Sequence, residues 1–428
     1  MNTVSLEKYI REGGLDETLA TLYGKENTER QRERYLRAVA AFGAEYGSDR
    51  EVSIFSVPGR SEISGNHTDH NHGCVIAAAI DLDIIAVAAQ SEERRIRIHS
   101  EGFPEDVVEL EGICAENAGK YASGAIIAGV CDGFMRAGHA ICGYDAYTTS
   151  NVFKGSGLSS SAAFEDMVGN ILNHFSNGGA VSAPEIAKIS QYAENEFFGK
   201  PCGLMDQTAC SVGGFVAIDF ADPKNPIIEK LDFDLTAAGY TLCIVNTGGN
   251  HADLNEDYAS VPSEMKAVAK QLGHEVLRDV TRDELLRAVP ALRRSVGDRA
   301  ILRAMHFIGE NERVRAQSAA LRAGDVDGFL DGVRASGDSS FKWLQNVYTT
   351  INVKEQGLSL ALCIAEALFR GYEKRAVARV HGGGFAGTVQ AFVPTENVPA
   401  FRTAMDAVFG DGATSPLRVR AEGAIRVL

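Results

Sequence analysis

The sequence predicts an α+β fold, and two observations carry that prediction. Residues 52–99 hold short apolar runs separated by polar loops and end in the alternating pattern RRIRIH, which is typical of strands. Helical spacings dominate from about residue 253 to 371, and strand patterns return at residues 376–381 and 388–393. Strands, then a long helical stretch, then strands again indicate sheets and helices that occupy separate parts of the chain.

A segment rich in Pro, Asp and Gly at about residues 222–240 divides this pattern. Residues of this kind interrupt helices and strands and are common in connecting segments. A new strand is predicted directly after it, at residues 240–246. We therefore expect an N-terminal domain over residues 1–235 and a C-terminal domain over residues 236–428.

Further helices and strands follow from apolar spacing and helix-end signals. Tyr35, Val39, Phe42 and Tyr46 recur at helical spacing and predict a helix in an N-terminal extension. Ser182, with Pro184 just inside, predicts the start of a helix that runs towards Phe198. The other elements expected are helices at residues 119–137 and 395–409 and strands at residues 145–149, 214–220 and 422–428.

The composition favours a soluble protein that acts on small molecules. A formal charge of −15 argues against nonspecific binding to nucleic acid or to an anionic membrane. No apolar run reaches the roughly 18–20 residues needed to span a bilayer, and the N-terminus lacks the features of a signal peptide, so we expect a cytoplasmic protein. The eight cysteines form no CxxC pair and are expected to be reduced thiols.

Residues 151–163, NVFKGSGLSSSAA, follow a predicted strand and precede helical spacing that begins at Phe164. Gly155 and Gly157 permit unusual backbone angles, and a helix that begins near Ser159 would present free N–H groups to an anion. The loop has neither the Walker A lysine nor the Rossmann glycine spacing. The residues alone leave two interpretations: a phosphate-binding loop, or a turn whose serines cap a helix.

Residues 58–73, PGRSEISGNHTDHNHG, form a polar loop between predicted strands and concentrate basic and acidic side chains. One interpretation is a transition-metal site formed by His67, Asp69, His70 and His72. The spacing does not place two histidines on one helix face, which argues against it. The other interpretation makes Arg60, His67 and Asp69 hydrogen-bond partners of a hydroxyl-rich substrate.

Two further stretches have ordinary structural interpretations when each is taken alone. Asp206 stands among apolar neighbours in PCGLMDQ, and a lone aspartate in a loop is usually a turn former. Residues 382–384 are three glycines after a predicted strand, and they would permit close approach of the backbone to a ligand or form a flexible turn.

In this order, PGR-x₅-NHTDHNHG, GSGLSSSAA, PCGLMDQ and GGGFAGT closely resemble the signature motifs of the galactokinase family within the GHMP small-molecule kinases. The resemblance covers nearly the full length. It implies an N-terminal ribosomal-protein-S5-like α/β domain and a C-terminal ferredoxin-like domain, with the active site between them. It also implies ATP-dependent 1-phosphorylation of a monosaccharide by a monomer or weak homo-oligomer.

By this resemblance, the ATP phosphates would be held by Gly155, Ser156, Gly157, Leu158, Ser159, Ser160 and Ser161. One loop serine, assigned as Ser160, would bind Mg²⁺ together with Glu194. Asp206 would take the proton of the anomeric hydroxyl, and Arg60 would hold Asp206 ionised and stabilise the developing charge. The sugar would contact Asn66, His67, Asp69, Gly203 and Tyr258.

Asn66 departs from the family pattern, which has glutamate at this position of Gly-Glu-His-Thr-Asp. The family glutamate accepts a hydrogen bond from the 6-hydroxyl, whereas asparagine is neutral and can also donate. Galactose is the expected substrate, and the alternatives are galacturonate, arabinose or N-acetylgalactosamine. Some relatives are sugar sensors without turnover, but intact Arg60, Glu194 and Asp206 favour catalysis.

Overall fold

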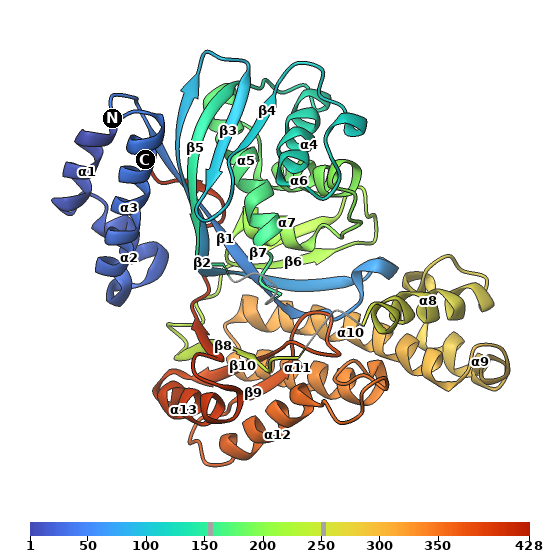
Figure 1. Cartoon of the computed structure of the whole chain (residues 1–428). Helices are drawn as coiled ribbons and strands as arrows, with labels where there is room; N and C mark the ends of the chain where they lie inside the picture. Colours follow the sequence, from blue (N-terminus) through green and yellow to red (C-terminus); the bar gives the residue numbers. More distant parts are fainter. Residues whose placement is uncertain (153–156, 250–253) are drawn as a thin grey trace.

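The computed structural model describes residues 1–152, 157–249 and 254–428 and contains two sheets (Figure 1). The first sheet has the strand order β12-β1-β2-β5-β3-β4, and β6 pairs with β2 and with β7. Its strands are β1 (Ser53–Ser64), β2 (Cys74–Ser91), β3 (Arg95–Ser100), β4 (Asp106–Glu109), β5 (Gly143–Ser150), β6 (Phe215–Asp219), β7 (Ile227–Leu231) and β12 (Ile425–Arg426). β3 and β5 are parallel, and the other described pairs are antiparallel.

Helices cover both faces of the first sheet (Figure 1). One face carries α1 (Thr3–Arg11), α2 (Asp16–Tyr23) and α3 (Thr28–Tyr46), and the other carries α4 (Ser123–Arg136), α5 (Ser160–Asn177), α6 (Ala183–Tyr192) and α7 (Met205–Val212). Ile54 and Val87 pack in one cluster with Phe42 of α3, whereas Phe55 packs with Met167 of α5 on the opposite side. Because both faces are buried, β2 is apolar along most of its length.

The second sheet has the order β11-β8-β10-β9 and is antiparallel. Its strands are β8 (Tyr240–Asn246), β9 (Val377–Val380), β10 (Thr388–Pro394) and β11 (Thr414–Leu417). Near it and towards the first sheet lie α10 (Asp298–Ala323), α11 (Val326–Ser339), α12 (Gly357–Phe369) and α13 (Val398–Phe409). To one side, α8 (Asn255–Gln271) and α9 (Arg282–Ser295) pack against α10. The Cys74 backbone N–H donates to Asn311 Oδ1 at 2.6 Å, so α10 is joined to the start of β2.

The structure confirms the predicted α+β class and most predicted elements, with several differences. Residues 58–64, which were expected to lie in a polar loop, are part of β1, and β4 was not predicted. β7 lies inside the segment interpreted as a domain connection and extends the first sheet. β11 was not predicted because it contains Pro416, and proline is tolerated only at a sheet edge such as this one. The expected strand at residues 422–428 is limited to Ile425–Arg426, which pairs with β1.

The boundary at residues 235 and 236 stays a prediction. β7 ends at Leu231 in the first sheet and β8 begins at Tyr240 in the second, but β12 returns to the first sheet. All eight cysteines are free thiols, as expected. Among the described residues, no helix combines the length and apolar character required to cross a membrane.

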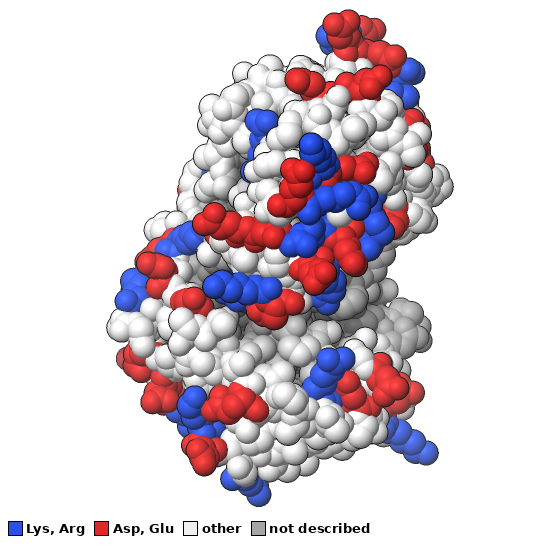
Figure 2. Space-filling view, turned by 90° about the vertical axis from the view of Figure 1, so that its left-hand side faces the viewer, with Lys and Arg blue, Asp and Glu red and all other residues white. Residues whose placement is uncertain are grey.

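Charged side chains of both signs are interspersed on the face shown in Figure 2. The N-terminal helices contribute ion pairs such as Arg32–Asp16, whose closest N–O distance is 2.6 Å. Interspersed charges of this kind give no extended field of one sign on this face.

Candidate active site

Arg60 and Asp206, which are 146 residues apart in the sequence, form a bidentate ion pair. Arg60 Nε donates to Asp206 Oδ1 at 2.8 Å, and Arg60 Nη2 donates to Oδ2 at 2.6 Å. Burial by itself would lower the pKa of Arg60, but the charge of Asp206 and their hydrogen bonds raise it above its ordinary value. Asp206 lies in the first turn of α7, where the helix dipole favours a negative charge, and its side chain is 33% exposed. The carboxylate of Asp206 is therefore held in place and remains accessible.

The described end of the Gly/Ser loop lies against this pair. Arg60 Nη1 donates to the Gly157 carbonyl, and the Arg60 backbone N–H donates to the Leu158 carbonyl at 3.1 Å. Ser159 has a left-handed backbone conformation at the start of α5, and its hydroxyl donates to Asp206 Oδ2 at 2.5 Å. The predicted positions Gly155 and Ser156 lie outside the described residues. The structure therefore brings the N-terminus of α5 beside Arg60 and Asp206.

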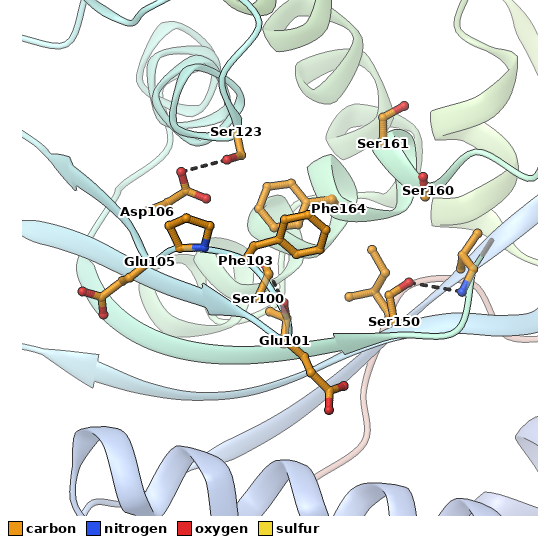
Figure 3. Close-up of a pocket in the computed structure, with 14 residues that line it drawn as sticks. Ser100, Glu101, Phe103, Glu105, Asp106, Ser123, Ser150, Ser160, Ser161 and Phe164 are labelled. Carbon is orange, nitrogen blue, oxygen red and sulfur yellow. Dashed lines mark hydrogen bonds between the residues drawn. The ribbon is translucent and has the colours of Figure 1, made fainter. Parts of the chain in front are cut away.

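A cavity of about 640 Å³ opens next to this helix start (Figure 3). Ser160, Ser161 and Phe164 of α5 line one side, and Figure 3 shows Phe103 and Phe164 projecting into the space. The rest of the lining comes from Ile84, Ser100, Glu101, Pro104, Glu105, Asp106, Ser123, Thr148, Ser150 and Val152. Sequence patterns did not identify Phe103 or Ser123, because neither belongs to a motif and they are distant in sequence from the serine run.

The three carbonyls of residues 382–384 hold three residues that were predicted to contact a sugar. Asn66 Nδ2 donates to the Gly382 carbonyl at 2.7 Å, and His67 Nε2 donates to the Gly383 carbonyl at 2.8 Å. The Tyr258 hydroxyl donates to the Gly384 carbonyl at 2.9 Å. A Cβ atom at position 383 would lie 2.5 Å from the Tyr258 ring, so only glycine fits there.

Asp69 and Gly203 are also neighbours in the structure. A Cβ atom at Gly203 would lie 2.6 Å from Asp69 Oδ2, so a side chain there would displace this carboxylate. Burial raises the pKa of Asp69, and the charges of Glu62 and Asp206 raise it further, whereas His67 opposes the shift. Asp69 therefore lies in the electrostatic environment of Asp206 and beside the loop that carries it.

Asn66 is fully buried, and its carboxamide is saturated by protein groups. Besides Gly382, Nδ2 donates to Glu62 Oε1 at 3.0 Å, while Oδ1 accepts from Asn346 Nδ2 at 2.8 Å and from the Ser340 hydroxyl at 3.3 Å. An amide has two N–H donors and two acceptor positions, and all four are used. The prediction that Asn66 contacts the sugar gains no support from this geometry and stays a prediction.

Glu194 is buried in η4 (Ala193–Phe198), a π-helical segment, and contacts Gln207, the residue after Asp206. Its Oε1 accepts from Lys200 Nζ at 2.8 Å, and its Oε2 accepts from Gln207 Nε2 at 3.0 Å. Gln207 Nε2 also donates to Glu165 Oε2 at 2.9 Å. Burial and the charge of Glu194 raise the pKa of Glu165 well above its ordinary value.

These oxygen atoms suit a divalent cation held partly by phosphate. Carboxylate and hydroxyl oxygens are hard ligands, and Glu165 Oε1 is buried without a hydrogen-bond partner among the described residues. Within the described ranges, the side chains of His, Cys, Asp and Glu form no group of three or more that would hold a metal ion alone. The described residues therefore give the all-protein histidine metal site no support.

Comparisons with known proteins agree with this geometry. A model of the galactokinase galactose-binding signature matches residues 40–90, and one of the GHMP kinase N-terminal domain matches residues 125–214. The galactokinase of Streptomyces coelicolor is 30% identical over 87% of this chain and 92% of its own length. The galactokinase of Enterococcus faecalis is 31% identical over 88% of this chain and 93% of its own length.

Solved structures give the same fold. The structure of Lactococcus lactis galactokinase complexed with galactose aligns with a TM-score of 0.74 at 25% identity, over 90% of this chain and 98% of that one. A mevalonate kinase structure aligns with a TM-score of 0.59 at 15% identity, over 85% of this chain and 98% of that one.

The matched N-terminal domain and these structural neighbours define the class of protein as a GHMP kinase, a phosphotransferase with an alcohol group as acceptor. Relatives that are 30–31% identical over 87–88% of the chain then settle the family within this class. The chain belongs to the galactokinase family.

Proposed function

We propose that this protein transfers the γ-phosphoryl group of ATP to the anomeric hydroxyl of galactose, forming galactose 1-phosphate and ADP. The observation that carries the proposal is the ion pair between Arg60 and Asp206 beside the start of α5. Asp206 accepts the hydroxyl proton as the sugar oxygen forms a bond to the γ-phosphorus, and the bond from that phosphorus to the leaving ADP oxygen breaks. Arg60 stabilises the charge that develops near the transferred group.

The sugar is assigned to the surface formed by His67, Asp69, Gly203 and Tyr258. The contacts of His67 and Tyr258 with Gly383 and Gly384, and the closeness of Gly203 to Asp69, support this assignment. A neutral sugar offers several hydroxyl donors, which suit the carboxylates and carbonyls gathered there.

The nucleotide is assigned to the cavity beside α5, with its phosphates at the helix N-terminus near Ser159, Ser160 and Ser161. The cavity volume of about 640 Å³ falls within the usual range of small-molecule sites. Helix N-termini favour phosphate because their N–H groups and dipole face the anion. Ser160 and Glu194 would hold Mg²⁺, which would neutralise charge on the phosphates.

Phe103 is expected to support the purine base by stacking. It lines the cavity and is 49% exposed. Phe103→Ala is expected to raise the KM for ATP about tenfold and to change the KM for galactose less than twofold, because stacking contributes about 1–3 kcal/mol per base. Initial-rate kinetics in both substrates measure this. Val107→Ala, at a similarly exposed apolar residue of β4, is the matched control, and an unchanged KM for ATP in the Phe103 variant would contradict the nucleotide assignment.

A sugar panel tests the activity itself. Purified protein with ATP and Mg²⁺ is expected to form ADP with galactose at a kcat/KM at least about tenfold above that for galacturonate, arabinose or N-acetylgalactosamine. Omission of the divalent ion is expected to abolish turnover. Detection of galactose 1-phosphate by phosphorus NMR identifies the acceptor position. Galactose binding without phosphorylation would overturn the proposal in favour of a sugar sensor.

The expectations of a cytoplasmic location and of a monomer or weak homo-oligomer stay predictions. Light scattering at two protein concentrations measures the oligomeric state directly.

A further inference from the structure

Glu62 lies on the same side of β1 as Arg60. The pairing of β1 with β2 runs without a register shift from Arg60↔Ala79 to Glu62↔Ala77. Side chains two positions apart on a regular strand point to the same face. Because Arg60 reaches Asp206, the carboxylate of Glu62 faces the same space.

Among the described residues, protein groups pair with only one oxygen of the Glu62 carboxylate. Oε1 accepts from Asn66 Nδ2 and from Arg379 Nη2, both at 3.0 Å. Oε2 receives no hydrogen bond from any residue that the structure describes. The side chain is 10% exposed, whereas that of its partner Arg379 is fully buried. The buried Arg379 therefore holds the Glu62 carboxylate through Oε1, and Oε2 remains as an acceptor for a ligand.

The charge of Glu62 acts on two residues that are assigned to the proposed site, Arg60 and Asp69. Glu62 raises the pKa of Asp69 together with burial and Asp206, and Glu62 also contributes to the raised pKa of Arg60. The charges of Glu62 and Asp206 thus both act on Asp69. An additional anion would be repelled there, whereas hydroxyl groups would find acceptors.

The geometry points to Glu62 Oε2 as the group that recognises the C6 end of the substrate, where it accepts a hydrogen bond from the 6-hydroxyl. The amide of Asn66 does not have this role. This inference rests on the proposed sugar kinase function. Asn66 is saturated by protein groups, and its Nδ2 lies 3.0 Å from Glu62 Oε1, so the two side chains occupy adjacent positions at this end of the site. A negative charge at this end selects neutral hexoses and disfavours uronic acids.

The test compares galactose, 6-deoxygalactose and galacturonate as substrates of the wild type and of Glu62→Gln. In the variant, kcat/KM for galactose is expected to fall about 10- to 100-fold, because a hydrogen bond to a charged acceptor is lost. For 6-deoxygalactose, which lacks that hydroxyl, the fall is expected to be less than about threefold. The ratio of kcat/KM for galacturonate to kcat/KM for galactose is expected to rise at least about tenfold, because like-charge repulsion is removed.

Two controls separate recognition from folding. Asp145→Asn also removes a buried carboxylate, which on β5 is paired with Arg50 and Arg97. This variant is expected to leave the kcat/KM ratios between the sugars unchanged. Glu62→Asp keeps the charge beside Arg379 and is expected to retain the discrimination against galacturonate. Thermal unfolding of each variant reports on stability.

The outcomes distinguish this inference from the proposed function. Suppose that the wild type phosphorylates galactose and that Glu62→Gln does not alter the ratio of kcat/KM for galactose to kcat/KM for 6-deoxygalactose. This result overturns the role of Glu62 alone. A wild type that phosphorylates none of these sugars overturns the kinase proposal. In that case, calorimetric titration of the same sugars still decides whether Glu62 binds the 6-hydroxyl, because affinity is then measured in place of turnover.

Discussion

Replacement of Asp206 with alanine is expected to lower kcat about 10²- to 10⁴-fold while sugar binding is largely retained. General base catalysis contributes a factor of this size, and no other carboxylate contacts Arg60 among the described residues. Rapid-quench measurement of ADP formation gives the rate of transfer, and calorimetric titration gives the affinity for galactose.

Asp219→Asn is a suitable control for the loss of a paired carboxylate. Asp219 forms a two-contact pair with Arg278 at 2.8 and 2.9 Å, but it lies at the end of β6. This variant is expected to keep kcat within about twofold of wild type, since this partly buried pair lies outside the proposed site. Phosphoryl transfer at a near wild-type rate in Asp206→Ala would rule out Asp206 as the base.

Asp83→Asn is expected to lower the free energy of unfolding by about 3–5 kcal/mol, the range for a buried ion pair that loses one partner. Asp83 is fully buried on β2, where Oδ1 accepts from Arg34 Nη1 at 2.6 Å and Oδ2 accepts from Arg420 Nη1 at 3.3 Å. The Tyr23 hydroxyl donates to Oδ2 at 2.5 Å. One carboxylate thus joins the N-terminal helices, the first sheet and a segment near the C-terminus.

The effect of Asp83 depends on pH in a defined direction. Burial by itself would raise the pKa of Asp83, but Arg34 and Arg420 outweigh it and hold the pKa below its ordinary value. A depressed folded-state pKa contributes stability above the unfolded value of about 3.9, and this contribution is lost as the pH falls through the folded-state pKa. The stability difference between wild type and Asp83→Asn is therefore expected to narrow below about pH 4.

Urea denaturation at a series of pH values measures both effects of Asp83→Asn. Asp16→Asn, which removes an exposed pair with Arg32, is expected to change the free energy of unfolding by at most about 1 kcal/mol. An equal, small effect of the two variants at pH 7 would contradict the central role of Asp83.

Local patterns predicted elements better than they predicted the site. The helix with Tyr35, Val39 and Phe42 is α3, and residues 240–246 are β8, because apolar spacing reflects which face is buried. The pairing of Arg60 with Asp206 joins distant segments, and no spacing within either segment specifies it. It was inferred from the family resemblance, and the structure confirms the contact.

Glu62 and Phe103 show what the sequence could not indicate. The sequence predicted that Glu62 is a polar residue of a loop, whereas it lies within β1. Its proposed role depends on contacts with Asn66 and with Arg379, and Arg379 is 317 residues further along the chain. Phe103 follows β3 in a turn, and its position in the cavity depends on the packing of α5 across the sheet. Such relations arise from tertiary structure and leave no periodic signal.

The return of β12 to the first sheet constrains the order of folding during translation. Phe55 and Ser56 of β1 pair with Arg426 and Ile425, and buried Arg420 completes the charge pairing of Asp83. The ribosome must therefore synthesise the entire second sheet and its helices before the first sheet gains its last strand. Until then the outer edge of β1 has unpaired backbone groups. The two halves of the protein therefore complete their folding together, after synthesis has passed residue 426.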